Sequence, residues 1–289
     1  ITVNAVDDAP AFSVATTAVD AAENQQAVGT YTATDTESDT ITYSKSGTDS
    51  DLFTLGSSNG VLTFSSAPNF EDPGCGASDN SNTCTVIVTA TANSQSDTNT
   101  ITVTVTNVND NSPTDMALSA TSAAENAAAG ADIGTLSTTD GDASGNAHVY
   151  TLVTDSGGAT AYSGTDFAID SAILEVGSSP GFNYETTTSY TVYVKVADGS
   201  NTAYVEAFTI SITDVNDQTP TFTGVDSTPS SAEMATGAFE TYTIVDTDTV
   251  GSYSCTLAGA DKDDITCSIS GTTVSLTYAA TTNYEAPAD

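Results

Sequence analysis

Apolar side chains alternate with threonine or other polar side chains in several short segments of the chain. Four segments show the alternation most clearly: 86–90, 101–106, 192–196 and 208–213. Successive side chains of a β-strand point to opposite faces, so this pattern predicts half-buried antiparallel strands with one face toward a core and one toward water. The side chains expected in two such cores are Ile101, Val103, Val105, Phe208, Ile210 and Ile212.

Short turns separate these strand segments. The pairs Asn59-Gly60, Asp140-Gly141 and Asp198-Gly199 each join an amide or acid residue to a glycine, which is typical of tight turns. No segment has the periodicity of an amphipathic helix of useful length. The pattern therefore predicts an all-β fold made of small β-sandwiches with little helix.

A proline-terminated, oxygen-rich segment recurs along the chain. Asn107–Pro113 returns as Asp214–Pro220 and, more loosely, as Asn4–Pro10. The interval of about a hundred residues is the length of one sandwich domain. The recurrence predicts the end of a preceding repeat and a linker at 1–10, repeat 1 at 11–113, repeat 2 at 114–220 and a truncated repeat 3 at 221–289. We expect the chain to be a fragment of a longer array.

Two glutamates recur in step with this period. The early glutamate is Glu23, Glu125 and Glu233, and the glutamate that follows an aromatic residue is Glu71, Glu185 and Glu285. Acids that only solubilise a surface would drift in position from repeat to repeat. Acids that keep their place indicate a repeated site.

The charge balance narrows the partners and suggests a ligand. The chain carries 38 acidic and 3 basic residues, for a formal net charge of −35. A field of this sign repels nucleic-acid phosphates and anionic lipids, and no apolar run approaches the about 18 residues of a membrane helix. We therefore expect no nucleic acid and no membrane contact by this segment. Clustered carboxylates repel each other by about 3 to 4 kcal/mol per close pair, so the clusters favour a hard cation, calcium.

The four cysteines form two local pairs. Cys75 lies near Cys84, and Cys255 lies near Cys267. An even count at short separations predicts two disulfides within repeats, and hence an oxidising, extracellular setting. A zinc site is the alternative, although no paired CxxC is present and the chain has a single histidine, His148.

Repeat 2 contains five acidic motifs in a fixed order. They are Glu125, Asp140-Gly141-Asp142, Asn183-Tyr184-Glu185, Ala197-Asp198-Gly199 and the linker that ends at Pro220. In this order and at this period, the chain resembles a tandem array of cadherin-type repeats over nearly all of its length. The resemblance implies Greek-key, immunoglobulin-like β-sandwiches arranged end to end, with calcium ions at each junction between repeats.

The resemblance also implies the calcium ligands. At the first full junction they would be Glu23, Glu71, the Val108 carbonyl, Asn109, Asp110, Asn111, Asp140, Asp142, Asp198 and a carbonyl of Asn146. At the second they would be Glu125, Glu185, Val215, Asn216, Asp217, Gln218, Asp246 and Asp248. At the N-terminal boundary only Asp7, Asp8, Asp35 and Glu37 remain, with Asp39 nearby, so fewer or weaker ions are expected there. Asn69 and Asn183 stand where many cadherins have aspartate, which should weaken one ion per junction.

The resemblance implies a calcium-rigidified extracellular or cell-surface array that mediates adhesion or forms a stalk or filament. Its partners would be further copies of itself, surface proteins or glycans. The loops rich in threonine, alanine and serine resemble those of microbial cadherin-like proteins more than animal ones. The alternative is a carbohydrate-binding, lectin-like adhesin module, although such grooves usually use exposed aromatic residues and the chain has no tryptophan.

We do not expect an enzyme. The segment Asp155-Ser156-Gly157-Gly158 resembles the nucleophile segment of trypsin-like proteases, but the one available base, His148, falls in the same expected hairpin. A polar turn is the better interpretation of this segment, and His148 itself is expected to be a surface strand residue.

Overall fold

The computed structural model describes residues 6–76, 78, 80–142, 147–199, 201–232, 234 and 236–282. Two compact units make up the chain. Unit 1 comprises Ile1–Ala117, Ser137–Tyr150 and Lys195–Glu206, and unit 2 comprises Leu118–Leu136, Thr151–Val194 and Ala207–Asp289. The repeat boundaries derived from the sequence stay predictions.

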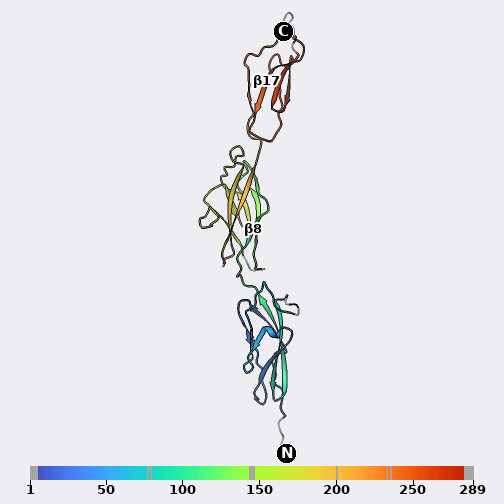
Figure 1. The fold of residues 1–289 in the computed structure, drawn as a ribbon, viewed down its shortest axis with the longest axis vertical. Coiled ribbons are helices and arrows are strands. Elements are labelled where there is room, and N and C mark those ends of the chain that lie inside the picture. The colour runs from blue at the N-terminus through green and yellow to red at the C-terminus, as the bar shows by residue number, and fades with distance from the viewer. Residues whose placement is uncertain are drawn as a thin grey trace, which may run out of the picture. The chain divides into compact units, whose positions relative to one another are not determined.

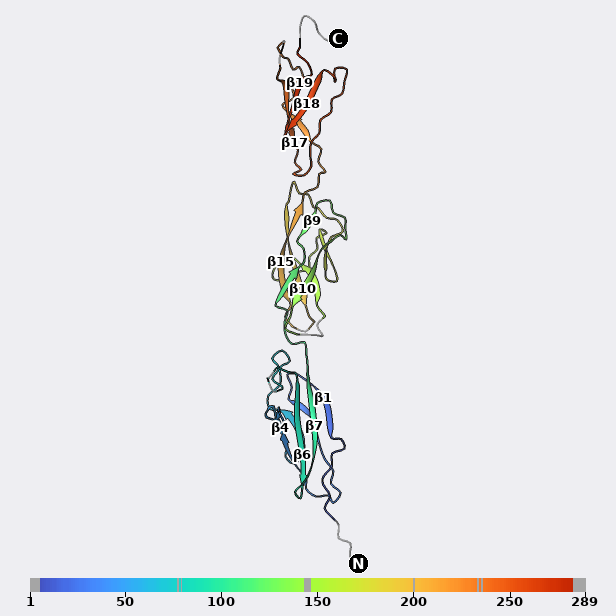
Figure 2. The same ribbon diagram turned by 90° about the vertical axis from the view of Figure 1, so that its right-hand side faces the viewer.

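The N-terminal part of unit 1 consists of two small sheets. The four-stranded sheet has the order β1-β7-β6-β3, with β1 at Thr16–Ala22, β7 at Gln95–Thr106, β6 at Thr83–Ala92 and β3 at Thr42–Ser46. The three-stranded sheet has the order β2-β5-β4, with β2 at Ala27–Thr30, β5 at Val61–Phe64 and β4 at Phe53–Leu55. Figure 2 shows β1, β7 and β6 side by side in the larger sheet. The one helical element among the described residues is the 3-10 turn η1 at Ser50–Leu52.

The alternation along β7 places its apolar side chains in a core. Ile101 and Val103 are fully buried and Val105 nearly so, as predicted. From the opposite sheet, Phe53 and Phe64 stack with ring centroids 4.6 Å apart and join the same apolar cluster. Each fully buried aliphatic or aromatic side chain contributes about 1.5 to 3 kcal/mol, so this packing stabilises the fold of the region substantially.

Two further four-stranded sheets form the middle of the chain. One has the order β12-β13-β10-β8, with β12 at Phe167–Asp170, β13 at Ile173–Val176, β10 at Asp132–Thr139 and β8 at Asp115–Leu118 (Figure 1). The other has the order β11-β14-β15-β9, with β11 at Val149–Val153, β14 at Ser189–Ala197, β15 at Tyr204–Thr213 and β9 at Ser122–Ala124. Leu174, Val194 and Ile210 are fully buried. Ile212 is buried as predicted, whereas Phe208 is only half-buried.

The last described sheet lies in unit 2 and contains β17, which Figure 1 labels. Its order is β16-β17-β19-β18, with β16 at Thr221–Thr223, β17 at Ala238–Val245, β19 at Thr273–Tyr278 and β18 at Ile265–Ser270. Ile244 and Val274 are buried, but Phe222 is 58% exposed. The apolar side chains of this sheet are therefore less well covered than those of the other sheets.

Parallel strand pairing occurs in both units, which the alternating pattern does not predict. β1 pairs with β7 and β9 pairs with β15 in parallel register. Alternation fixes which face of a strand is buried but does not name its neighbours. Both short strands lead directly into an early glutamate, so this pairing fixes where Glu23 and Glu125 enter their sites.

Both predicted disulfides are present. Cys75 is bonded to Cys84 and Cys255 to Cys267, with Cα–Cα distances of 4.8 and 6.4 Å. Cys75 and Cys84 are buried in the core. Within the described residues, no helix combines the length and the apolar character that crossing a membrane requires.

Candidate metal centres at the linkers

The early glutamate of repeat 1 binds two pieces of backbone. Glu23 follows β1 directly and is 2% exposed. Its Oε2 accepts the backbone N–H of Phe70 and its Oε1 accepts that of Val108, both at 2.7 Å. Charge-assisted bonds of this kind are strong, so Glu23 holds the loop before Glu71 and the start of the linker together.

Glu125 repeats this arrangement in unit 2. It follows β9, is 2% exposed, and accepts the N–H of Tyr184 at 2.8 Å and that of Val215 at 2.7 Å. The early glutamate, the loop before the second glutamate and the start of the linker therefore meet in the same way at both linkers. The N–H groups of Val108 and Val215 contact the glutamates, while the ligand role of their carbonyls stays a prediction.

A first group of three carboxylates surrounds the start of the linker in unit 1. Oxygens of Glu23, Glu71 and Asp110 lie within 4.8 Å of one another. The Oε1 atom of Glu71 is buried and has no hydrogen-bond partner. Burial, together with repulsion from Glu23, Asp110 and Asp142, raises the pKa of Glu71 above its ordinary value. A buried carboxylate oxygen without a donor, among like charges, is the environment that a cation would relieve.

A second group in unit 1 consists of three aspartates. Oxygens of Asp140, Asp142 and Asp198 lie within 4.8 Å of one another, and the last two residues are 7% and 5% exposed. The N–H of Asn111 donates to Asp142 Oδ2 at 3.1 Å, which connects this group to the linker. Charged side chains are rarely buried without a partner of opposite charge, so this group also suits a cation.

An amide nitrogen lies within a small cradle of oxygens beside these aspartates. The Nδ2 atom of Asn201 is 2.6 Å from Asn109 Oδ1, 2.6 Å from the Asn111 carbonyl and 2.8 Å from Asp198 Oδ2. An amide nitrogen carries two hydrogens, but three oxygens converge on it here. Such a convergence of neutral and charged oxygens matches the ligand set of a hard cation. The sequence analysis did not identify Asn201.

Two more groups of three carboxylates lie in unit 2. Oxygens of Glu125, Glu185 and Asp214 lie within 4.8 Å of one another, as do those of Glu185, Asp217 and Asp248. The buried oxygens without a hydrogen-bond partner are both Glu185 oxygens, Asp214 Oδ1 and Asp248 Oδ1. Glu185 belongs to both groups and links them.

The pKa of Glu185 reflects this crowding. The nearness of its own backbone N–H lowers the pKa, but desolvation and the nearby carboxylates of Asp248, Glu125 and Asp217 together raise it above its ordinary value. Protons therefore compete with any cation for this carboxylate more effectively than for an isolated glutamate.

Asp214 is a candidate ligand that the sequence analysis missed. It begins the second linker, at the place that Asn107 holds in the first. The alignment of the two linkers contained the signal, because an acid replaces an amide at one position of an otherwise matching segment. The second linker therefore carries one more negative charge than the first at this position.

No protein-family model and no curated protein matches this chain. Solved structures do match. The human desmocollin-1 ectodomain has a TM-score of 0.65 and 19% identity over 92% of this chain and 53% of its own. The extracellular domain of protocadherin γB4 has a TM-score of 0.53 and 21% identity over 99% of this chain and 46% of its own. A protocadherin γB7 EC3-6 structure, described as a cis-dimer, has a TM-score of 0.52 and 19% identity over 96% of this chain and 67% of its own.

The chain has the fold of tandem cadherin repeats. It spans about half the length of the desmocollin-1 and protocadherin γB4 structures that it matches. The predicted all-β fold of cadherin-type sandwiches is therefore confirmed. In these cadherin-type repeats, the four carboxylate groups include residues of the two predicted linkers or of the loops against them.

The remaining predicted ligands of the second cadherin-type linker have mixed surroundings. The N–H of Gln218 donates to Asp248 Oδ2 at 2.8 Å, and its side-chain amide donates to Asp217 Oδ1 at 2.7 Å. Asp246 accepts the N–H of Asp248 at 3.2 Å but belongs to neither three-acid group. Asn216 and Asp246 line one pocket. Asn146, Glu233 and Glu285 lie outside the described residues.

The N-terminal boundary lacks a comparable group. The N–H of Asp8 donates to Glu37 Oε2 at 3.2 Å, and the N–H of Glu37 donates to Asp35 Oδ1 at 3.1 Å. Among the described residues, no group of three acids close enough to share one ion includes Asp7, Asp8, Asp35 or Glu37. The expectation of weaker binding here stays a prediction, and its structural basis is this looser arrangement.

The single histidine lies against the second carboxylate group of unit 1. His148 precedes β11 rather than lying in a strand, and its Nε2 is 3.1 Å from Asp140 Oδ2. This partner of His148 was not predicted, because a single side-chain contact leaves no periodic signal in the sequence. The segment Asp155–Gly158 forms a turn in which Asp155 accepts the N–H of Gly157 at 2.8 Å.

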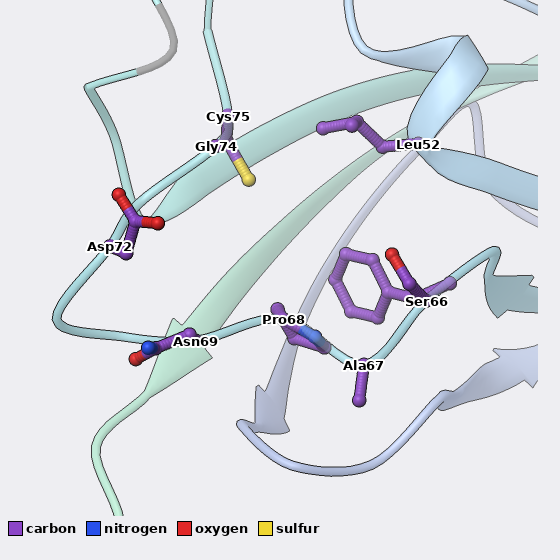
Figure 3. A pocket seen from close by; sticks show the side chains of 9 residues that line it. Leu52, Ser66, Ala67, Pro68, Asn69, Asp72, Gly74 and Cys75 are labelled. Atoms are coloured by element: carbon purple, nitrogen blue, oxygen red, sulfur yellow. The ribbon is translucent and has the colours of Figure 1, made fainter.

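A pocket of about 240 Å³ is lined in part by Asn69 and Asp72, on either side of Glu71 in the sequence. Figure 3 shows it between Leu52 and the loop that carries Pro68, Asn69 and Asp72, with the Cys75 sulfur turned toward it. The Oδ1 atom of Asn69 accepts the N–H of Glu71 at 2.9 Å, so this loop also shapes the metal-binding candidate. At this place the side-chain oxygen of Asn69 accepts a backbone N–H within its own turn.

Proposed function

We propose that this chain is part of a calcium-rigidified extracellular array that mediates adhesion or forms a surface stalk or filament. The observation that supports the proposal is the presence of four groups of three carboxylates, which include buried oxygens without a hydrogen-bond partner. Two groups lie at each of two successive linkers. A protein that used these acids only for solubility would leave them exposed to water.

The residues present fit calcium better than other divalent metals. The candidate ligands are carboxylate, amide and backbone oxygens, with no cysteine, and the single histidine contacts an aspartate. Hard cations of large size take six to eight oxygens in flexible geometry. When bound, calcium supplies the positive charge that offsets the repulsion among the carboxylates. Glu23 and Glu125 hold the linker backbone, and Asp142 and Asp248 hold it from the following repeat.

The fold and the disulfides support an extracellular place of action. Two disulfides are formed, and disulfides persist in oxidising compartments. One matched protocadherin structure is described as a cis-dimer, which concerns that protein. For this chain we infer protein partners, either further copies of itself or other surface proteins or glycans. We assign it no catalytic role.

The proposal is tested by solution scattering with and without a chelator, using wild-type protein and Asp110→Ala. We expect chelation or Asp110→Ala to increase bending between the repeats, while the β-sheet circular dichroism stays nearly unchanged, because the cores do not depend on the ion. Asp51→Ala is the matched control, since Asp51 is an exposed acid of η1 outside all four groups. Identical scattering of wild-type protein in calcium and in chelator would contradict the mechanism.

A further inference from the structure

The residue after each early glutamate has a left-handed backbone. Asn24, Asn126 and Met234 have φ values of 62°, 55° and 58°. Left-handed conformations are uncommon for residues other than glycine, and asparagine adopts them more readily than most. The recurrence at three corresponding positions shows that the fold itself imposes this backbone conformation.

At the first linker, this residue contacts the central aspartate. The Nδ2 atom of Asn24 donates to Asp110 Oδ2 at 2.5 Å. The other oxygen, Asp110 Oδ1, accepts the side-chain amide of Asn111 at 3.0 Å. Two neutral amides, one from repeat 1 and one from the linker itself, therefore fix the orientation of one carboxylate.

The second linker repeats this arrangement with different side chains. Asn126 Nδ2 donates to Asp217 Oδ2, and Asp217 Oδ1 accepts the side-chain amide of Gln218 at 2.7 Å. The donor from the linker changes from asparagine to glutamine, whereas the donor from the left-handed position stays the same. The contact is therefore found independently in unit 1 and in unit 2.

The backbone conformation and the amide contact are separable. Met234 has the same left-handed backbone, and its N–H donates to the Thr282 carbonyl at 3.0 Å, much as the Asn24 N–H donates to the Pro68 carbonyl at 3.0 Å. A methionine side chain donates no hydrogen bond. The amide is thus not needed for the local fold. The left-handed backbone favours asparagine at these positions, and the contacts of Asn24 and Asn126 with the linker aspartates are an additional feature.

We propose that Asn24 and Asn126 are positioning residues that tether the linker aspartate to the preceding repeat whether or not a cation is bound. A neutral donor can orient Asp110 without adding charge to a site that already holds Glu23 and Glu71. Each carboxylate oxygen can accept more than one bond, so the amide leaves Asp110 able to bind a cation. This inference rests on the proposed function, because the tether would keep the linker in a geometry that is ready to bind calcium.

The first test is hydrogen exchange of wild-type protein and Asn24→Gly in a chelator. Glycine tolerates the left-handed backbone, so this change removes the amide without adding strain. We expect the Asn111 N–H, which donates to Asp142, to exchange about fivefold faster in Asn24→Gly, the ratio that loss of one modest hydrogen bond produces. Ser171→Gly is the matched control, since Ser171 is left-handed at φ 56° in the turn between β12 and β13.

The second test separates a charge effect from a positioning effect. Asn24→Asp has the same shape but replaces the donor by a carboxylate, which repels Asp110. In chelator, we therefore expect the Asn111 N–H to exchange faster in Asn24→Asp than in Asn24→Gly. Equal exchange in wild-type protein and both variants would overturn the proposal. Failure of wild-type protein to bind calcium would contradict the proposed function alone, because the exchange in chelator still measures the tether.

Discussion

The linker at Asp7 and the linker at Asp110 satisfy their carboxylates in different ways. Asp7 Oδ1 accepts the amide of Asn93 at 3.3 Å, and Asp7 Oδ2 accepts that of Gln95 at 3.1 Å. These hydrogen bonds, the one from Gln95 first, lower the pKa of Asp7. Asp110 instead lies within a group of three carboxylates, and the pKa of its neighbour Glu71 is raised.

From this difference we expect that side chains, rather than the fold alone, decide how strongly a linker binds a cation. Amides from the region of the β6–β7 turn supply donors to Asp7, whereas desolvation and the nearby carboxylates still raise the pKa of Asp39 beside it. At the first linker, the amide of Asn201 follows β14 and reaches the linker too, but six carboxylates in two groups remain there. We therefore expect calcium to change the first linker much more than the N-terminal boundary.

The largest effect is expected from a matched pair of substitutions. Asp140 and Asp35 are the first acids of corresponding motifs, but only Asp140 belongs to a three-acid group. Asp140→Ala should weaken calcium binding at the first linker by at least about tenfold, the loss that even an outer partner of a metal ligand can cause. Asp35→Ala should leave the affinity nearly unchanged. Isothermal titration calorimetry measures the calcium affinity of both variants. Equal losses of affinity would contradict the difference between the first linker and the N-terminal boundary.

A second substitution should convert the N-terminal boundary into a cation-dependent one. Asn93 Nδ2 donates to Asp39 Oδ2 at 2.7 Å as well as to Asp7. Asn93→Asp replaces this donor with a third carboxylate, so the calcium-free protein should lose stability through like-charge repulsion. Calcium should reverse this loss of stability. Thermal unfolding with and without calcium measures the change, and Asn93→Gly serves as the control without added charge. A calcium response no larger than that of the control would contradict the interpretation.

Sequence patterns predicted the all-β fold and most of the acids that the structure brings together at the linkers, while the role of these acids as ligands stays a prediction. The in-step positions of Glu23 and Glu125 follow from the repeat, and the structure brings both to their linkers. The contacts of Asn24 and Asn201 could not be predicted, because they depend on a left-handed backbone and on a loop after β14. The parallel pairing of β1 with β7 could not be predicted either, because alternation identifies the buried face of a strand and not its neighbouring strand.

An exchange of side chains between the two cadherin-type linkers should shift affinity by a smaller amount. Asn107 and Asp214 occupy the same position, and Asp214 shares a group with Glu125 and Glu185. Asp214→Asn should weaken calcium binding at the second linker by about threefold to tenfold, because ligand charge tunes affinity. Asn107→Asp should strengthen binding at the first linker. Calcium titration of the two variants measures whether the affinity falls in Asp214→Asn and rises in Asn107→Asp. A change of affinity in the same direction in both variants would contradict this interpretation.

The smallest expected effect is the response to pH. The pKa of Glu71 is raised above its ordinary value of 4.5. Its contribution to the stability of the calcium-free protein is therefore fully present below pH 4.5 and is lost as pH rises through the raised pKa. The lowered pKa of Asp7 has the opposite sign, since its contribution is present above 3.8 and is lost as pH falls through the lowered pKa. Calcium affinity at the first linker should therefore decline as pH falls from 7 toward 4.5, which calorimetry at several pH values can measure. Affinity that rises over this range would contradict the assignment.

The proposal that calcium orders the two linkers with carboxylate groups can be tested by hydrogen exchange with and without calcium, because this measurement resolves each linker in the wild-type chain. The account predicts that calcium slows exchange in residues 107–112 and 214–219, which contact the carboxylate groups, and changes exchange in residues 6–10 far less. The strands of the cores, such as β6 and β7, should exchange slowly in both conditions. Equal protection of all three linkers, or no calcium effect on 107–112 and 214–219, would contradict the account.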